Sequence, residues 1–269
     1  MKKILSLALS LVLLASVLLC FASCGGGKKG PQVLLDYGTL TVGVEIGYPP
    51  FEYFADDGTT PIGFDVELIA AVAEKLGLKV VYRNTGWDAI FAGLDTANYD
   101  VVCSAVTINS DRMENMLFST PYINNYQALV VKVGSAQDGT VDGLEDLNGL
   151  AVALQDETTS DELLSTKVAA NEVSCTINAF EQVTTAFSAL ANGEVQAVLA
   201  DSTVADGYVA SNPETYKIVW LQQDAPEQFG IAIRKGNTVL QSAINWAMAE
   251  LEKEGKITEL YDKWFAAAN

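Results

Sequence analysis

The chain of 269 residues contains no histidine, only four cysteines, and 16 Lys and Arg residues against 34 Asp and Glu residues. Without an imidazole it cannot form a His-dependent nucleophile triad, a histidine general base or a zinc site of the usual Cys and His kinds. The formal net charge of −18 argues against nucleic acid as a partner, because proteins neutralise its phosphates with Lys and Arg. The composition therefore excludes most hydrolytic chemistry and predicts no nucleic-acid partner.

What the chain does contain is typical of a folded protein. Apolar residues make up 49% of the sequence and charged residues 19%, which is not the composition of a disordered chain. A chain of this length can form one large domain or two small ones, each with its own core.

The first residues have the pattern of a secretory leader. Lys2 and Lys3 precede residues 4–21, all of which are apolar, Ser or Cys. A retained transmembrane helix is the alternative, since this stretch is about long enough to span a bilayer. The following Phe21-Ala22-Ser23-Cys24 resembles a bacterial lipobox, with Phe in place of the usual Leu. We therefore predict a lipoprotein signal peptide over 1–23 and a lipid on Cys24.

Cleavage before Cys24 leaves a mature chain whose charge is more negative by two, because Lys2 and Lys3 are lost. Residues 24–37 then form a flexible tether rich in Gly and Lys. The expected location is the cell surface or the periplasm, with the protein attached to the cell membrane by its N-terminal lipid.

Strand-like and helix-like patterns alternate through the rest of the chain. The first unit has strands at 40–44, 79–82 and 101–106, with helices at 65–76 and 87–94. After a strand at 128–133, the second unit has strands at 150–154, 173–177, 195–200 and 216–221, with helices after Thr158 and at 183–190. A strand at 230–234 and helices at 239–251 and 257–264 end the chain. This alternation predicts two α/β units with mostly parallel sheets.

Three segments could carry binding chemistry. Glu45 to Tyr53 directly follows the first strand, where open α/β sheets hold their ligands, although Pro49-Pro50 could simply make a rigid turn. Ser104 to Arg112 leaves a buried strand and enters a helix, and it offers hydroxyls, free N–H groups and an arginine fork for a carboxylate. The alternative for Arg112 is a surface arginine above an ordinary N-cap.

Asp201 ends an apolar strand and could accept hydrogen bonds from an ammonium group. It could equally cap the next helix, with Ser202 and Thr203 beside it. The spacing of Trp87 within its helical stripe indicates a core position. On these residues alone, both interpretations of each segment stay open.

Ten motifs in order resemble the family 3 bacterial extracellular solute-binding proteins, the polar amino acid receptors of ABC importers. They extend from about Gly38 to Phe265. The motifs are Tyr48 to Tyr53, Gly63 to Leu68, Trp87-Asp88, Asn98 to Val102, Thr107 to Arg112, Phe118 to Tyr122, Leu144 to Gly149, Ala189 to Gly193, Gly230 to Gly236 and Tyr261 to Phe265.

The resemblance implies an α/β fold of the type II periplasmic-binding-protein kind, with two mixed sheets, flanking helices and a two-strand hinge. Lobe 1 is expected over 38–123 plus 230–269, and lobe 2 over 124–229. The hinge segments are expected near 122–126 and 225–229. Cys103 and Cys175 then fall in different lobes, so we predict two free, buried thiols rather than the disulfide that an exported protein would allow.

The resemblance also implies how an amino acid is bound, without a metal or cofactor. Arg112 holds the α-carboxylate, with help from Thr107, from backbone groups near Ala105 and from Thr159 across the cleft. Asp201 meets the α-ammonium, with groups of Ser104, Ala105 and Thr107. Tyr48 and Trp87 form apolar walls, while Glu45 and Gln155 face the ligand's side chain.

The chain departs from the family pattern at one point in the expected site. Glu157, preceded by Asp156, occupies the position of a usual glycine before Thr158 and Thr159. Glycine there would allow close approach of backbone to ligand. The added negative charge, together with Glu45, favours a cationic or amide side chain in the ligand, as in arginine, lysine or glutamine.

We therefore expect a monomeric, non-enzymatic receptor that closes on a polar amino acid and delivers it to an ABC transporter permease. An exported lyase similar to cyclohexadienyl dehydratase is the alternative on the same fold, but its ring-shaped dicarboxylate needs more than one cationic residue. A receptor domain for a sensor kinase or chemoreceptor is a third possibility. No second transmembrane helix or signalling domain follows Trp264 in this sequence, so its partner would be a separate chain.

Overall fold

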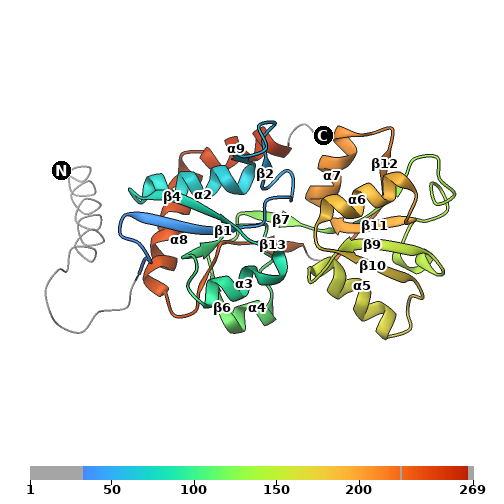
Figure 1. Ribbon diagram of the computed structural model, residues 1–269, viewed down its shortest axis with the longest axis horizontal. Coiled ribbons are helices and arrows are strands. Elements are labelled where there is room, and N and C mark those ends of the chain that lie inside the picture. Colours follow the sequence, from blue (N-terminus) through green and yellow to red (C-terminus); the bar gives the residue numbers. More distant parts are fainter. Residues whose placement is uncertain (1–32, 225, 266–269) are drawn as a thin grey trace, which may run out of the picture.

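The computed structural model describes residues 33–224 and 226–265. Two five-stranded sheets with flanking helices lie side by side along the long axis of the molecule (Figure 1). The predicted leader, Cys24 and most of the tether lie outside the described residues. Within the described ranges, no helix is both long enough and apolar enough to cross a membrane.

The first sheet has the strand order β4-β1-β5-β14-β6. Its strands are β1 (Thr39–Val44), β4 (Lys79–Asn84), β5 (Val101–Val102), β6 (Met116–Phe118) and β14 (Ala232–Arg234). β1 is parallel to β4 and β5, whereas β14 is antiparallel to β5 and β6. A strand from the end of the chain thus lies inside the N-terminal sheet, which makes the sheet mixed.

Helices α2 (Phe64–Lys75), α3 (Trp87–Asp95), α8 (Thr238–Lys253) and α9 (Lys256–Phe265) flank this sheet, and the short strands β2 (Tyr53–Phe54) and β3 (Pro61–Ile62) pair beside it. α2 begins after Gly63, whose φ of 134° suits glycine. A Cβ atom there would lie 2.1 Å from the carbonyl oxygen of Phe51, so the close approach of these two backbones requires glycine.

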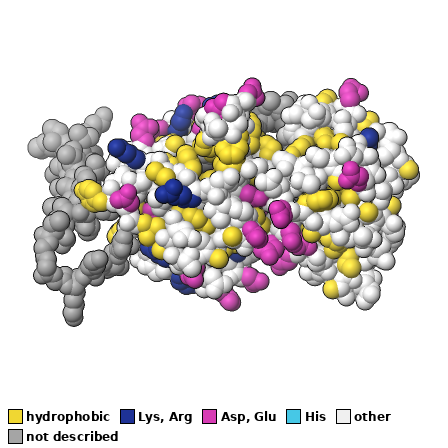
Figure 2. All heavy atoms as spheres, viewed as in Figure 1, with side chains coloured by type: hydrophobic (Ala, Val, Ile, Leu, Met, Phe, Trp, Pro, Cys, Tyr) yellow, Lys and Arg dark blue, Asp and Glu magenta, His cyan; other side chains and the backbone are white. Residues whose placement is uncertain are grey.

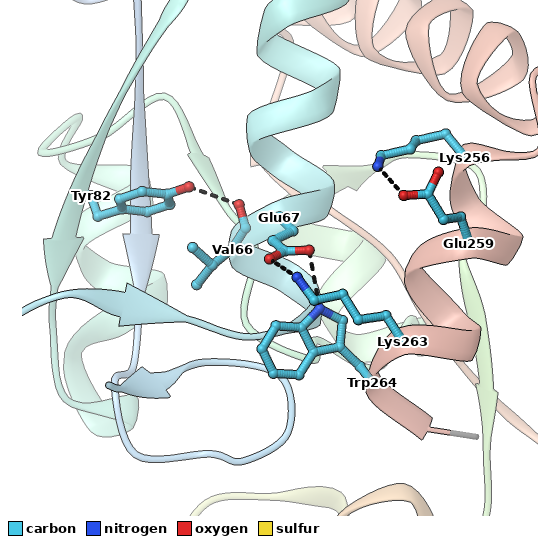
Figure 3. Close-up of polar contacts among 7 residues, drawn as sticks. All are labelled: Val66, Glu67, Tyr82, Lys256, Glu259, Lys263 and Trp264. Carbon is cyan, nitrogen blue, oxygen red and sulfur yellow. Dashed lines mark hydrogen bonds and ion pairs between the residues drawn. The ribbon is translucent and has the colours of Figure 1, made fainter. Parts of the chain in front are cut away.

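Side chains of the C-terminal helix α9 hydrogen-bond to a side chain of α2 (Figure 3). Glu67 on α2 accepts hydrogen bonds from Lys263 Nζ at 2.5 Å and from Trp264 Nε1 at 3.3 Å. The ring of Phe265 packs 5.3 Å from the rings of both Phe51 and Phe64. The last helix therefore packs into the same hydrophobic core as Phe51 and Phe64 from the N-terminal part of the fold.

The second sheet has the order β10-β9-β11-β8-β12. Its strands are β8 (Gln127–Lys132), β9 (Ala151–Gln155), β10 (Thr176–Phe180), β11 (Ala197–Asp201) and β12 (Tyr216–Leu221). β9 is parallel to β10 and β11, and β8 is antiparallel to β11 and β12. The flanking helices are η1 (Leu144–Leu147), α5 (Thr159–Ala169), α6 (Val183–Asn192) and α7 (Ser202–Ser211).

Two short strands connect the sheets. β7 (Ile123–Asn125) and β13 (Glu227–Phe229) pair antiparallel, and they lie between the two sheets in Figure 1. Two mixed sheets, flanking helices and a two-strand crossing confirm the predicted fold class. The residue boundaries of the lobes stay predictions, and we use the names lobe 1 and lobe 2 for the predicted units.

The structure corrects some details of the sequence prediction. Cys103 and Cys175 are both free thiols, but only Cys103 is buried. Cys175 is half-buried: it packs against the core of the second sheet but precedes β10, which begins at Thr176 and not at 173 as predicted. The strand expected over 101–106 ends at Val102, and the chain then bends toward the lobe interface through Ala105, which has a positive φ of 48°.

Candidate ligand-binding site

A small cavity of about 20 Å³ lies between the lobes. Most of the residues around it lie at or just after the ends of strands β1, β5, β9 and β11 or at the starts of helices, which is where open α/β sheets place their ligands. The structure brings together all ten residues predicted to bind ligand, and their binding roles stay predictions. The lining consists of Glu45, Tyr48, Trp87, Ser104, Ala105, Thr107 and Arg112 from lobe 1, with Gln155, Thr158, Thr159 and Asp201 from lobe 2.

Arg112 is the cation of this lining. It lies in the short helix α4 (Ser110–Asn115), and its guanidinium carbon is 5.4 Å from the ring centre of Trp87 and 5.1 Å from that of Phe91. Its Nη1 donates to the carbonyl oxygen of Thr107 at 2.9 Å. Burial lowers the pKa of Arg112, while the nearby acids Glu227 and Asp201 oppose that shift. Arg112 is therefore held in a defined place between aromatic rings, and Asn109 provides the N-cap beneath it.

Asp201 is the acid that lobe 2 presents to the cavity. It is 6% exposed, and it accepts hydrogen bonds from Tyr48 Oη at 2.5 Å, Asn125 Nδ2 at 2.7 Å and Gln127 Nε2 at 3.0 Å. Burial, with the charge of Glu227, raises the pKa of Asp201 to about 7. α7 begins directly after it, but the Asp201 side chain makes no capping hydrogen bond. Asp201 thus occupies the N-cap position of α7, but its side-chain oxygens accept from Tyr48, Asn125 and Gln127 and not from the helix.

Glu45 and Gln155 form one wall of the cavity. Gln155 Nε2 donates to both carboxylate oxygens of Glu45, at 2.9 and 2.8 Å, and to the carbonyl oxygen of Glu181 at 3.0 Å. Three acceptors around this nitrogen fix the orientation of the amide. Gln155 Oε1 is buried without a hydrogen-bond partner. This wall therefore presents acceptors to whatever lies beside it.

The environment of Glu45 also affects its protonation. It is 4% exposed, and burial raises its pKa to about 7, with a further contribution from the charge of Asp88. The hydrogen bond from Gln155 opposes this rise. Glu45 therefore changes charge near neutral pH, as Asp201 does.

Glu227 is a residue near the site that the sequence analysis missed. It lies in hinge strand β13, and its Oε2 accepts from Thr107 Oγ1 and Thr159 Oγ1, each at 3.0 Å. Its Oε1 accepts from Gln127 Nε2 at 3.2 Å. A threonine hydroxyl has one proton, so both threonines present lone pairs elsewhere while they donate to Glu227. No local motif marks Glu227, because its partners lie 68 to 120 residues away.

This contact changes the expected roles of the two threonines. Their hydroxyls, while bonded to Glu227, cannot donate to a carboxylate, although they can accept from an ammonium group. α5 begins at Thr159, so the first N–H groups of that helix lack partners within the helix. Backbone N–H groups, rather than the hydroxyls, are then the threonine donors that suit an anion.

Trp87 and Glu157 join the two lobes at the edge of the cavity. Trp87 Nε1 donates to the carbonyl oxygen of Glu157 at 3.0 Å. Glu157 has a φ of 57°, a left-handed conformation that glycine adopts with less strain. This conformation accounts for the glycine in the family pattern, and Glu157 adopts it here with an exposed side chain.

Comparison with known proteins identifies the family of this chain. The chain matches the bacterial extracellular solute-binding proteins, family 3, over residues 40–267. It is 36% identical to the L-cystine-binding protein TcyJ of Escherichia coli K12 over 231 residues, which are 86% of this chain and 84% of that protein. It is 32% identical to a probable histidine-binding protein of Neisseria gonorrhoeae over 256 residues, 94% of this chain and 93% of that protein.

A solved structure described as an ancestral arginine-binding protein bound to arginine is also similar. The TM-score is 0.79 at 39% sequence identity, covering 85% of this chain and 98% of the other. The chain therefore belongs to family 3 of the bacterial extracellular solute-binding proteins. It is a solute-binding protein of the amino acid transport class and not an enzyme.

Proposed function

We propose that this protein captures a polar amino acid between its lobes, with arginine, lysine or glutamine favoured, and delivers it to an ABC transporter permease. The observation that carries the side-chain preference is the wall formed by Glu45 and Gln155. A carboxylate and a buried, unpartnered amide oxygen both require donors. Guanidinium, ammonium and amide groups supply donors, whereas the carboxylate of aspartate or glutamate does not.

The two charged ends of the amino acid have matching groups on opposite lobes. In this proposal Arg112, which lies against the rings of Trp87 and Phe91, binds the α-carboxylate, and Asp201 accepts from the α-ammonium; both residues line the cavity, which supports these roles. Hydrogen bonds to charged groups contribute about 1.5–3 kcal/mol each, and a micromolar ligand needs about 8 kcal/mol. Two such contacts with several backbone hydrogen bonds are sufficient for a micromolar receptor.

The charge of the site supports a cationic ligand. A zwitterion pairs its carboxylate with Arg112 and its ammonium with Asp201, which leaves Glu45 and Glu227 without a cation. Asp88, Asp156 and Glu157 near the cavity are exposed, and Figure 2 shows acidic side chains gathered on the viewed face where the lobes meet. Such a field attracts cationic solutes and speeds their association at low salt.

The size of the cavity supports capture by opening and closing. A volume of about 20 Å³ has room for roughly one or two water molecules, far less than an amino acid. Entry therefore requires the lobes to separate or lining side chains to move, and the β7–β13 crossing is the connection about which the lobes can rotate. A ligand that contacts both lobes stabilises the closed form, which the permease would recognise.

Attachment to the membrane belongs to the same proposal. Its support is the sequence of the leader, with Cys24 as the lipidated residue after cleavage. The tether of residues 24–37 would keep the binding lobes close to the permease.

Cystine is a second candidate ligand. The similar protein TcyJ is named for L-cystine. The second ammonium group of cystine could meet Glu45 and Gln155 Oε1, but its second carboxylate would also have to be placed among acids. Arginine and lysine carry no such group, so we favour them over cystine.

Calorimetry with the twenty amino acids and cystine tests the proposal. We expect arginine, lysine or glutamine to bind most tightly, and tight binding of aspartate or glutamate would contradict the side-chain preference. Incubation with prephenate or arogenate should give no aromatic product. Formation of that product would instead support the lyase alternative.

A further inference from the structure

Two carboxylic acids lie buried in lobe 1 behind the cavity lining. Glu52 precedes β2 and Asp65 lies in the first turn of α2, and both are 0% exposed. Among the described residues, the six ion pairs all involve other acids, and no Lys or Arg hydrogen-bonds to either carboxylate. Two buried negative charges without a cation would be very costly.

The hydrogen bonds of this pair are incomplete in a specific way. Glu52 Oε1 accepts from Ser104 Oγ at 2.6 Å, and Asp65 Oδ2 accepts from the Ala105 N–H at 2.7 Å and from Tyr122 Oη at 2.8 Å. The remaining oxygens, Glu52 Oε2 and Asp65 Oδ1, are buried and have no partner. Each acid thus has one satisfied and one unsatisfied oxygen.

We propose that Glu52 and Asp65 hold one proton between them, with Glu52 Oε2 donating to Asp65 Oδ1, and that this pair positions the Ser104–Ala105 backbone beside the ligand cavity. A single proton turns two unsatisfied acceptors into one hydrogen bond and leaves one net charge instead of two. The proton belongs on Glu52 because Asp65 already accepts from two donors and is better stabilised as the anion.

The electrostatics of the two groups agree with this assignment. Burial, followed by the charge of Asp65, raises the pKa of Glu52 well above its ordinary value. Burial raises the pKa of Asp65 only to about 6, because the Ala105 N–H and the Tyr122 hydroxyl lower it. Glu52 therefore keeps its proton at a pH at which Asp65 has lost its own.

The pair reaches the ligand cavity through two adjacent residues. Ala105 has a φ of 48°, which is unfavourable for a residue with a Cβ atom, and its N–H is held by Asp65. Ser104 Oγ donates to Glu52 and accepts from the Glu45 N–H at 3.0 Å. Glu52 and Asp65 are therefore positioning residues for Glu45, Ser104 and Ala105, all of which line the cavity.

The same pair also reaches the hinge. Tyr122, whose hydroxyl donates to Asp65, directly precedes β7. A continuous path of hydrogen bonds thus runs from the cavity wall through the proton-sharing pair to the start of the lobe crossing. This inference rests on lobe 1 alone and does not depend on which ligand is bound.

The groups facing the pair are acidic or neutral. Glu45 and Tyr48 come from the segment after β1, Cys103 follows β5, and Tyr122 precedes β7. Burial raises the pKa of the Cys103 thiol and of the Tyr48 and Tyr122 hydroxyls well above their usual values. These three groups stay neutral and cannot compensate a second negative charge.

The shared proton links stability to pH with a definite sign. Glu52 ionises near 4.5 in the unfolded chain but at much higher pH when folded, so the folded state binds the extra proton. Stability from this group is fully present below pH 4.5 and declines as the pH rises. One such proton lowers the folding equilibrium constant by up to about tenfold per pH unit.

Infrared spectroscopy of the wild-type protein tests the proton directly. At about pH 7, above the Asp65 pKa of about 6, we expect the infrared spectrum of the wild type to contain one more protonated carboxyl C=O group than that of Glu52→Gln. Absence of this difference between the two folded proteins would overturn the proposal.

Three variants test the positioning role. Glu52→Gln replaces the shared proton with an amide N–H and keeps an acceptor for Ser104, so it should fold and lose about one proton from the pH dependence of denaturant unfolding at pH values above the Asp65 pKa of about 6. Asp65→Leu removes the acceptor of the Ala105 N–H and of the Tyr122 hydroxyl, and Glu52→Leu removes both the proposed donor and the acceptor of Ser104. The matched control is Glu67→Gln, because Glu67 lies on the same helix but is half-buried and paired with Lys263.

Amide hydrogen exchange of Ala105 reports on the position of the loop. We expect protection close to wild type in Glu52→Gln and Glu67→Gln, and exchange at least about tenfold faster in Asp65→Leu and Glu52→Leu, where donors or acceptors are left unpaired. Equal effects of Glu52→Gln and Glu52→Leu would contradict the hydrogen bond that Glu52 is proposed to donate. An unchanged Ala105 rate in all variants would contradict the positioning role.

Discussion

The two lobes have similar α/β layers, yet among the lining residues only lobe 1 brings a cation to the cavity. Lobe 1 contributes that cation, Arg112, with the aromatic rings of Tyr48 and Trp87 and the acid Glu45. Lobe 2 contributes the acid Asp201 and the neutral polar residue Gln155, together with threonines. Because an amino acid carries a carboxylate and an ammonium group on one carbon, a ligand with both groups can join the lobes. In our proposal, this difference between the lobes couples binding to closure.

The buried acids of the lobes differ in a second way. Asp65 in lobe 1 is used internally, since its hydrogen bonds go to a backbone N–H, a hinge tyrosine and, in our proposal, Glu52. Asp201 in lobe 2 also has three donors, but it lines the cavity and one of its donors, Tyr48, comes from the opposite lobe. One buried acid hydrogen-bonds within its own lobe, whereas the other lines the cavity.

The largest expected effect comes from removing the lobe 1 cation. Arg112→Ala should weaken arginine binding by at least about 100-fold, because a bidentate contact of about 3 kcal/mol or more is lost. The melting temperature without amino acid should stay close to wild type. Calorimetry and thermal melts measure both quantities.

Arg83→Ala is the control for this variant, since Arg83 is an exposed arginine of the same lobe. It should leave arginine binding unchanged. A large loss of stability in Arg112→Ala would show that Arg112 mainly supports the fold, and the comparison between lobes would then fail.

A smaller effect is expected from the lobe 2 acid. Asp201→Asn should weaken arginine binding by about 10- to 100-fold, because the ammonium loses a charged acceptor while the shape of the site is kept. Titration calorimetry measures the change, with Asp206→Asn on the exposed side of α7 as the control. Equal affinity of Asp201→Asn and wild type would assign the ammonium to another acid, such as Glu227.

The pH dependence of arginine binding tests the roles of one acid from each lobe, Glu45 and Asp201. Burial raises the pKa values of Glu45 and Asp201 to about 7, so both acids are increasingly protonated below neutral pH. A cationic ligand favours the ionised acids, so arginine affinity should fall by up to about tenfold per pH unit for each linked proton below pH 7. Calorimetry in buffers of different ionisation enthalpy should show proton release on binding near pH 7.

Glu45→Gln separates the contributions of the two acids to this effect. It should remove part of the proton release and reduce the preference for arginine over glutamine. Arginine affinity that does not change between pH 5 and pH 8 would contradict the placement of a cationic group beside these acids.

The smallest expected effect concerns the edge of lobe 2. Glu157→Gly should leave the free energy of unfolding unchanged or raise it by about 1 kcal/mol, because glycine adopts the positive φ without the Cβ clash. Differential scanning calorimetry checks this value. Glu157→Ala is the matched control, since it removes the same charge but keeps the Cβ atom, and it should not give the same gain.

The order of the elements could be read from the sequence because their apolar periodicity is local. The strands at 40–44, 150–154 and 216–221 and the C-terminal helices were placed within about two residues. The strand predicted over 101–106 ends at Val102. Beyond it, the Ala105 N–H donates to Asp65, 40 residues away in the sequence, and not to a neighbouring strand. Contacts of that range leave no periodic signal.

The site was predictable for a different reason. From residue types alone, Arg112 and Asp201 could either bind ligand or belong to an ordinary helix N-terminus. The family resemblance named ten binding residues, and the structure places these ten around one cavity. Glu227 and Gln127 were missed, because their contacts depend on how the hinge strands cross between the lobes. Glu52 and Asp65 lay within recognised motifs, yet only the folded chain reveals that they are buried together.

The central claim is that the two charged ends of one amino acid are held by different lobes. The most direct test is the shift in melting temperature of the wild-type protein with arginine, with agmatine, which lacks the α-carboxylate, and with the analogue of arginine that lacks the α-amino group. We expect arginine to raise the melting temperature by mass action, and each analogue to do so only at a concentration at least about tenfold higher. Equal stabilisation by arginine and either analogue would contradict the claim.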